Sequence, residues 1–307
     1  MIWNAIIYYL LVFPASLLPL RVIYVFTDCL YILLTSVLPY RKKVIKQNLK
    51  NSFPNKSEKE IQQLSKRFYR HLTDLLAESV KGLSISKKDL KKRFKVQNSD
   101  LLDELYANNQ SVLLVSGHYN NWEWLILSQA LLFNHKAVGV GMPLSNGFWD
   151  KKLNQRRGRF GMDIINSNNV REYFENKKEP TATLLLTDQS PGDSTKSFWM
   201  EFLNQKTPVL FGAEMFAHQY NEAVVFFHLE KIKRGRYVMH LKKITDQPKS
   251  MSWGEITIKH TKMLEKVINE RPEYWLWSHK RWKREVPNDI ENLALKQREK
   301  FNQKFNY

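Results

Sequence analysis

The chain has 307 residues and a mass of 36.5 kDa, which is enough for one large α/β domain or two small ones. Hydrophobic residues make up 43% of it, so a disordered protein is excluded. The 48 Lys and Arg residues outnumber the 30 Asp and Glu residues, and the net charge of +18 predicts an acidic partner. The single cysteine, Cys29, excludes a disulfide framework and a cysteine-based zinc site, which fits a reducing compartment.

The first 40 residues are strongly apolar, with Arg21 and Asp28 as their two charged side chains. Residues 22–40 approach the roughly 20 apolar residues that a membrane-spanning helix needs, whereas Pro14 and Pro19 interrupt the stretch before them. A cleavable signal peptide would begin with basic residues, and none precedes position 21. We therefore predict an uncleaved N-terminal membrane anchor. A buried helical hairpin of a soluble protein is the alternative.

A basic region follows the apolar segment: residues 41–100 carry 17 Lys and Arg against 6 Asp and Glu. The positive-inside tendency puts this side, and the rest of the chain, in the cytoplasm. Such a belt favours anionic headgroups by about 1 kcal/mol per residue near the surface. Apolar residues at spacings of three and four predict an amphipathic helix over residues 57–81, with Ser57 as its N-cap and Glu60 three residues later.

From position 111, short apolar runs alternate with helical patterns, which is typical of an α/β sheet with crossover helices. The predicted strands are residues 111–115, 137–142, 183–186, 223–229 and 237–244. The predicted helices are residues 122–133, 146–160, 170–176, 208–220 and 253–270. We expect a membrane anchor over residues 1–40, a basic helical region over 41–107 and one α/β catalytic domain over 108–307, with a central mixed sheet flanked by helices.

The end of the first predicted strand, VLLVSGHYNNWEW, carries the chemistry. Gly117 allows a sharp turn, His118 sits on it, and Glu123 falls in the first turn of the next helix, capped near Asn120 or Asn121. A carboxylate bonded to one imidazole nitrogen fixes the tautomer and makes the other nitrogen a competent base. The sequence has no G-x-S-x-G elbow, so this dyad predicts a base that activates a hydroxyl brought by the substrate. An ordinary turn histidine is the alternative.

The C-terminal segment WLWSHKRWK interleaves aromatic and cationic residues, a pattern that suits a membrane interface or stacking on nucleic acid. We expect no nucleic-acid partner, because the apolar N-terminus points to a bilayer and no recognised nucleic-acid motif is present. The remaining histidines lack partners at metal-ligand spacing, so no metal site is predicted. A non-enzymatic membrane scaffold that binds anionic lipid through the basic region remains a rival hypothesis.

The anchor, the basic region and the His-(four residues)-Glu motif together resemble the lipid A late acyltransferase family of Gram-negative envelopes. Further similar segments are Asn48, Leu49 and Phe53-Pro54, then RGRFG from Arg157 to Gly161, Asp188-Gln189 and the following WMEFLNQKTPV, and finally Pro272, Trp277, His279, Arg281 and Lys283. The resemblance covers residues 1 to about 285. Trp275 stands where the family often has Tyr, and Leu203-Asn204 stand where Phe-Gly is common.

The resemblance implies an acyltransferase-like fold at the inner membrane, with its catalytic domain on the cytoplasmic side. It implies transfer of a fatty acyl group from acyl carrier protein to a hydroxyl of a lipid A precursor, without an acyl-enzyme or a cofactor. On this reading His118 is the general base and Glu123 orients it.

Three further positions are expected to bind substrate. Attack on the thioester creates a negatively charged oxygen, and Arg157 is expected to help backbone amides near Gly117 to bind it. Arg157 could instead hold a lipid phosphate, and Arg156 or Arg159 are the alternatives for its role. Asp188 and Gln189 are expected to contact substrate, with a structural turn as the alternative. The alternative acceptors are glycerol phosphate, a lysophospholipid or an amino lipid.

Overall fold

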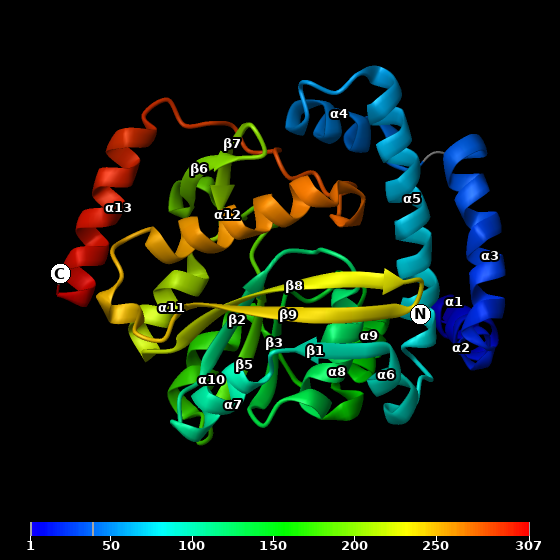
Figure 1. The fold of residues 1–307 in the computed structure, drawn as a ribbon, viewed down its shortest axis with the longest axis horizontal. Helices are drawn as coiled ribbons and strands as arrows, with labels where there is room; N and C mark the ends of the chain where they lie inside the picture. Colours follow the sequence, from blue (N-terminus) through cyan, green and yellow to red (C-terminus); the bar gives the residue numbers. More distant parts are fainter. Residues whose placement is uncertain (1, 39, 307) are drawn as a thin grey trace.

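The computed structural model describes residues 2–38 and 40–306. Its centre is a seven-stranded sheet with the strand order β1-β9-β8-β2-β5-β3-β4. The pair β8 and β9 is antiparallel and the other neighbours are parallel, which confirms the predicted central mixed sheet flanked by helices. In Figure 1, α8 and α9 lie below this sheet and α12 lies above it.

The strands of the central sheet are β1 (Phe94–Gln97), β2 (Val112–Ser116), β3 (Lys136–Gly141), β4 (Asp163–Asn166), β5 (Thr181–Leu186), β8 (Ala223–Lys233) and β9 (Arg236–Thr245). A separate antiparallel hairpin consists of β6 (Phe198–Phe202) and β7 (Gln205–Val209). The five predicted strands correspond to β2, β3, β5, β8 and β9. Residues 208 and 209 were expected in a helix but belong to β7, because they pair with β6.

The helices after the N-terminal segment are α4 (Lys42–Ser52), α5 (Glu58–Lys81), α6 (Lys87–Arg93), α7 (Asp100–Ala107), α8 (Trp122–Leu132), α9 (Gly147–Arg157), α10 (Val170–Asn176), α11 (Gly212–Tyr220), α12 (Glu255–Glu270) and α13 (Ile290–Phe305). Short 3-10 turns are η3 (Gly158–Phe160), η4 (Ser167–Asn169), η5 (Ser194–Lys196), η6 (Pro248–Ser250) and η7 (Pro272–Tyr274). The five helices predicted after position 111 correspond to α8 to α12, whereas α13 was not predicted.

Helix α5 begins as its sequence predicts. The Ser57 side chain accepts the Glu60 amide, and the Glu60 carboxylate accepts the Ser57 amide, so both halves of the capping box are present. Its buried face carries Ile61, Leu64 and Phe68, at the spacing of one helical face. The amphipathic helix predicted over residues 57–81 is therefore confirmed.

The N-terminal segment consists of α1 (Ile2–Ile7), the π-helical η1 (Tyr8–Val12), α2 (Phe13–Leu17), α3 (Leu20–Ile32) and the π-helical η2 (Leu33–Val37). The window Leu20–Val37 is long and apolar enough to cross a membrane, by length and composition, and 22% of it is buried. It overlaps the predicted span over residues 22–40, of which Pro39 lies outside the described residues. Most of this helix therefore faces outward, unlike the core helix of a soluble hairpin.

Strand β2 runs through the middle of the core. Val112 and Leu114 belong to one hydrophobic cluster, whereas Leu113 and Val115 belong to another on the opposite face. Burial on both faces explains why its sequence is a continuous apolar run. Because β2 and β5 are parallel neighbours with Ser116 opposite Leu186, the residues that follow the two strands emerge side by side.

Candidate active site

Two side chains that follow β2 and β5 form the centre of the site. The His118 Nδ1 atom lies 2.7 Å from Asp188 Oδ1, and the His118 backbone amide donates to Asp188 Oδ2 at 2.8 Å. Gly117 makes this approach possible, because a Cβ atom there would lie 2.8 Å from Asp188 Oδ2 and 2.7 Å from Leu264 Cδ2. The glycine is required for space, while the left-handed backbone of the turn belongs to Asn120, at φ 54°.

The Asp188 carboxylate is buried and ionised. The indole Nε1 of Trp275 donates to its Oδ2 atom at 2.7 Å. Burial by itself raises the pKa of Asp188, but the charge of the His118 imidazole and hydrogen bonds from His118 and Trp275 outweigh it, so the pKa lies below its ordinary value. An ionised carboxylate beside Nδ1 favours the proton on that nitrogen, so that in the neutral imidazole Nε2 carries the lone pair.

Gln189 lies on the other side of the imidazole. Its side-chain Nε2 is 3.2 Å from His118 Nε2, and an amide nitrogen is a donor, so His118 Nε2 is the acceptor of this contact. The Trp122 ring packs edge-to-face on the imidazole, with centroids 5.0 Å apart. The imidazole is therefore held at both nitrogens and on one face.

The turn that carries His118 is anchored on both sides. Tyr119 forms a β-bridge with Trp275, and the Asn120 amide donates to the Tyr274 carbonyl at 2.9 Å. Asn121 caps α8, because its Oδ1 accepts the Trp124 amide at 2.9 Å, as the sequence predicted for Asn120 or Asn121. The side-chain Nδ2 of Asn121 also donates to the buried Glu78 carboxylate.

Glu123 lies elsewhere than expected. Its carboxylate pairs with the guanidinium groups of Arg156 and Arg157, and Asp188 takes the place beside His118 that the sequence analysis gave to Glu123. Burial alone would raise the pKa of Glu123, but the two arginines outweigh it and hold the pKa below its ordinary value. The reason for the difference is that Trp122, one residue earlier, faces the imidazole, while Glu123 faces α9.

The three candidate arginines have different surroundings. Arg156 is buried and donates to the Ser79 carbonyl as well as to Glu123. Arg159 donates to the carbonyls of Gly82 and Ile85. Arg157 lines the cavity described next, so it is the arginine with a surface toward a bound molecule.

A cavity of about 580 Å³ opens beside His118, a size in the range of ligand pockets. Its polar lining includes His118, Arg157 and Gln189. Most of the rest is apolar and comes from β3, β5, α8, α9 and α11, including Ile126, Val140, Leu153, Leu184, Leu186 and Phe216. A long apolar chain with one polar end fits this lining, with the polar end at His118.

The C-terminal motif, Pro272 to Lys283, packs around the turn that carries His118. The Ser190 amide donates to His279 Nε2 at 3.1 Å, and burial lowers the pKa of His279 to about 4, so this imidazole is neutral. Arg281 is 1% exposed and donates to the Pro208 carbonyl at 2.7 Å. The Asn48 side chain of α4 donates to the backbone carbonyls of Trp277 and His279 at 2.9 Å each.

The sequence analysis predicted five site residues, and the structure places them in two groups beside one cavity. His118 contacts Asp188 and Gln189, whereas Glu123 pairs with Arg157, which lines the same cavity as His118 and Gln189. It assigned no role to Trp275. The available signal was its place in the C-terminal motif, but the partner of its indole depends on the tertiary fold. Within residues 2–38 and 40–306, no group of three or more His, Cys, Asp or Glu side chains is arranged to hold a metal ion.

An Asp–His pair at the carboxyl ends of parallel strands, opening on an apolar cavity, suits an enzyme that acts on an acyl chain. Comparison with known proteins agrees, since the family model for bacterial lipid A biosynthesis acyltransferases matches residues 1–284. The chain belongs to this family. It is 22% identical over 248 residues to the lipid A biosynthesis palmitoleoyltransferase of Escherichia coli (strain K12) and to the lipid A biosynthesis acyltransferase of Shigella flexneri, covering 80% of each chain in both cases.

Proposed function

We propose that this acyltransferase moves a fatty acyl chain from acyl carrier protein to a hydroxyl group of a lipid A precursor, with His118 as general base. The observation that carries the proposal is the contact of Asp188 with His118 Nδ1, which favours the tautomer whose Nε2 is the base. Asp188 holds Nδ1, and Nε2 accepts at the mouth of the cavity. The acceptor hydroxyl replaces the Gln189 amide at Nε2, donates its proton there, and becomes the nucleophile.

The reaction then needs no acyl-enzyme. The alkoxide attacks the thioester carbonyl, and the tetrahedral oxyanion collapses with release of the carrier thiolate, which takes the proton back from His118. Asp188 stabilises the imidazolium that forms between these steps. The His118 amide is already bonded to Asp188, so the Arg157 guanidinium is the better candidate to bind the oxyanion.

Several features support the finer assignments. The apolar cavity suits the acyl chain, since each buried CH₂ contributes about 0.8 kcal/mol. The net charge of +18 suits acidic acyl carrier protein and phosphorylated glycolipid. The exposed apolar helix α3 and the basic residues after it suit the anionic surface of the inner membrane on its cytoplasmic side, where we place the catalytic domain. Under this proposal the chain consists of a membrane anchor over residues 1–40, a basic helical region over 41–107 and a catalytic domain over 108–307.

The test is transfer of a radiolabelled acyl chain from acyl carrier protein to solubilised lipid acceptors, with His118→Ala run beside the wild type. We expect transfer to a lipid A precursor, reduced about 10²- to 10⁴-fold by the substitution. Transfer confined to glycerol phosphate, a lysophospholipid or an amino lipid would replace the acceptor assignment. A folded wild type that transfers to no acceptor would favour the lipid-binding scaffold.

A further inference from the structure

The N-terminal segment has an unusual position for a membrane-spanning anchor, because it is packed against the catalytic domain along its length. We infer that residues 2–38 lie within one interface of an anionic bilayer, as a fixed part of the folded domain, and do not cross it. This placement sets the mouth of the acyl cavity at the lipid surface. The membrane position inferred here does not depend on the reaction proposed above. The route by which a lipid acceptor and an acyl chain enter the cavity does rest on that proposed function, and the labels below measure position alone.

Helix α3 buries a continuous stripe against the domain. Leu20, Ile23, Tyr24 and Thr27 are each at most 9% exposed, at the spacing of one helical face. Figure 1 shows α3 side by side with α5, and the two helices make many close contacts. At the start of α3, the Lys81 ammonium of α5 donates to the Leu18 carbonyl at 3.0 Å.

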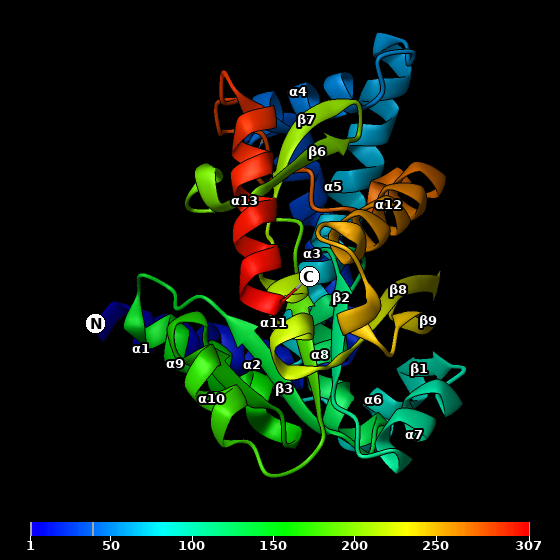
Figure 2. The same cartoon turned by 90° about the vertical axis from the view of Figure 1, so that its left-hand side faces the viewer.

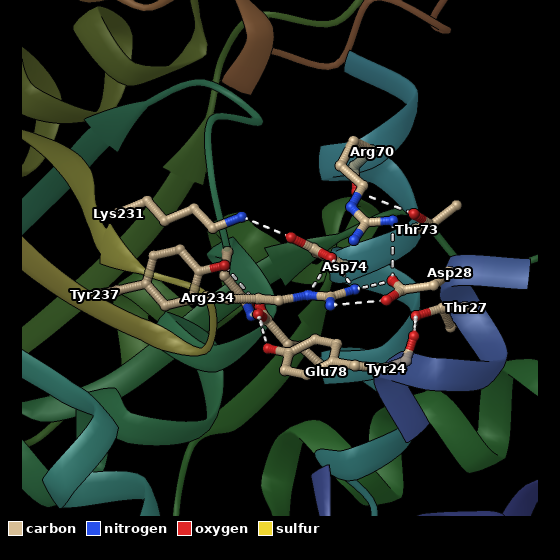
Figure 3. Close-up of polar contacts among 11 residues, drawn as sticks. Tyr24, Thr27, Asp28, Arg70, Thr73, Asp74, Glu78, Lys231, Arg234 and Tyr237 are labelled. Atoms are coloured by element: carbon tan, nitrogen blue, oxygen red, sulfur yellow. Dashed lines mark hydrogen bonds and ion pairs between the residues drawn. The ribbon is translucent and has the colours of Figure 1, made fainter. Parts of the chain in front are cut away.

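Polar contacts hold the middle of α3 in place. Figure 3 shows Asp28 between Arg70 of α5 and Arg234 of the β8–β9 turn, with an Arg70 to Asp28 distance of 3.1 Å. Arg234 also pairs with the buried Asp74 at 2.7 Å, and the Tyr24 hydroxyl donates to the buried Glu78 at 2.5 Å. Releasing α3 would take the Tyr24 hydroxyl away from the buried Glu78 and the Asp28 carboxylate away from Arg70 and Arg234.

This docking makes a spanning position unfavourable. If α3 crossed a bilayer, the domain surface beside its middle would lie in hydrocarbon as well. That surface includes Arg70 and Arg234, whose side chains are 44% and 29% exposed, and the exposed Lys233 and Arg236 of the same turn. Each charge at the bilayer centre costs roughly 2.5–3.5 kcal/mol or more. The domain therefore has to stay outside the hydrocarbon, and α3 stays with it.

The outer face of the segment is apolar enough to enter an interface. Side chains that are 60% or more exposed are Ile2, Trp3, Leu10, Leu11, Leu17, Val25, Phe26, Ile32, Val37 and Leu38. Exposed cations, Arg21 and the run Arg41, Lys42 and Lys43, lie beside this face in the chain. An apolar face next to cations matches an anionic headgroup layer over hydrocarbon, which is why we assign the face to a bilayer.

The same face leads to the cavity. Tyr8 packs against the rings of Phe148 and Trp149 on α9, with centroids about 6 Å apart, and Figure 2 shows α1 beside α9. The cavity lining continues from α9 into Met142 and Leu144, which are 79% and 46% exposed. A lipid acceptor and an acyl chain thus reach the site from the plane of the bilayer.

The test uses nitroxide labels in vesicles of phosphatidylethanolamine and phosphatidylglycerol. One label is on native Cys29, which is exposed, and others are on Val22→Cys and Leu33→Cys in a Cys29→Ser background. A label on Glu172→Cys, at an exposed position of α10, is the aqueous control. Residues 22 and 33 are 11 apart, so a helix that crosses places their labels about 16 Å apart in depth.

We expect the labels at residues 22 and 29 on α3 and at residue 33 at the start of η2 to share one shallow depth, accessible to oxygen. A depth that changes by about 16 Å from residue 22 to residue 33 would overturn the inference, because the helix would then cross the bilayer. Labels that oxygen cannot reach would also overturn it, because the face would then be buried between copies of the protein. Labels that stay as water-accessible as the Glu172→Cys control would also overturn it, because the face would then not bind lipid.

A second measurement is independent of labelling. A protease site added ahead of the N-terminus is exposed to protease in sealed vesicles with the catalytic domain outward. Cleavage without detergent is expected, because both ends of α3 then lie on the domain side. Cleavage that needs detergent would show that the helix crosses.

Discussion

Asp188 binds His118 twice, through the imidazole Nδ1 and through the backbone amide, although the two residues are 70 positions apart in the chain. Both follow parallel strands that are neighbours in the sheet, β2 and β5. One carboxylate therefore holds the backbone at His118 and orients its imidazole together. Trp275 ties the same carboxylate to the C-terminal motif.

Replacing Asp188 by asparagine is expected to impair catalysis more than stability. An amide cannot stabilise the imidazolium and favours no single tautomer, so we expect kcat to fall about 10²- to 10⁴-fold. Steady-state transfer rates and thermal unfolding of Asp188→Asn provide the two readouts. Glu172→Gln, an isosteric change at an exposed carboxylate on α10, is the matched control. An Asp188→Asn variant that is folded and fully active would remove Asp188 from the mechanism.

Glu123→Gln is expected to act in a different way. Glu123 is the partner of two guanidinium groups, one of them buried, and breaking such a buried pair costs about 3–5 kcal/mol. We expect a large fall in the free energy of unfolding, measured by denaturant titration. The pH dependence of kcat in the remaining folded enzyme should keep its wild-type position, because Asp188 still orients His118. A shifted pH profile with unchanged stability would return the orienting role to Glu123.

Gly117→Ala tests the close approach of Asp188. The added methyl group would lie within 3 Å of both Asp188 and Leu264, so the His118 turn has to move away from its partner. Since a displacement of about 1 Å can cost 10²-fold in rate, we expect activity to fall by at least that factor. Gly147→Ala is the control, because a Cβ atom there meets nothing within 4 Å. Equal activity of the two variants would contradict this account of Gly117.

Acid sensitivity is expected from buried neutral histidines. Burial lowers the pKa of His260 from 6.5 to about 4, so the folded protein binds fewer protons there than the unfolded chain between these values. This contribution to stability is complete above pH 6.5 and is lost as the pH falls through 4. It amounts to up to about 3 kcal/mol. His260→Leu should therefore flatten the dependence of the melting temperature between pH 6.5 and 4. If the melting temperature of the variant fell with pH as steeply as that of the wild type, His260 would not be a source of the acid sensitivity.

Asn48→Ala is expected to loosen the C-terminal motif. The Asn48 amide donates to two backbone carbonyls, and each lost bond to a buried group costs about 1–3 kcal/mol. Proteolysis of the segment after Trp275, followed by mass spectrometry, would detect the loosening. Gln47→Ala, at the exposed neighbouring position, serves as the control. Equal protection of this segment in both variants would show that Asn48 does not hold it.

Much of the candidate site was predictable because its signals are local. The place of His118 directly after an apolar strand, and Asn121 as a helix cap, follow from short-range rules of backbone geometry. The role expected for Gly117 was different, because Asn120 holds the left-handed backbone and Gly117 gives room for Asp188. The strands β1 and β4 were not predicted, since each has four residues and too short an apolar pattern to identify. Helix α13 was also missed, because its charged sequence buries little.

The sequence by itself determined the α/β elements, the apolar N-terminal segment, the candidate base His118 and the family resemblance. The tertiary structure decided which carboxylate lies beside the His118 imidazole. Glu123 is five positions from His118 and faces two arginines, whereas Asp188 reaches it because β2 and β5 are paired with Ser116 opposite Leu186. The docking of α3 was likewise decided by distant partners, Arg70 and Arg234. Periodicity and spacing predict contacts between residues that are close along the chain. Contacts made by strand register join distant residues, such as His118 and Asp188, and produce no local pattern in the sequence.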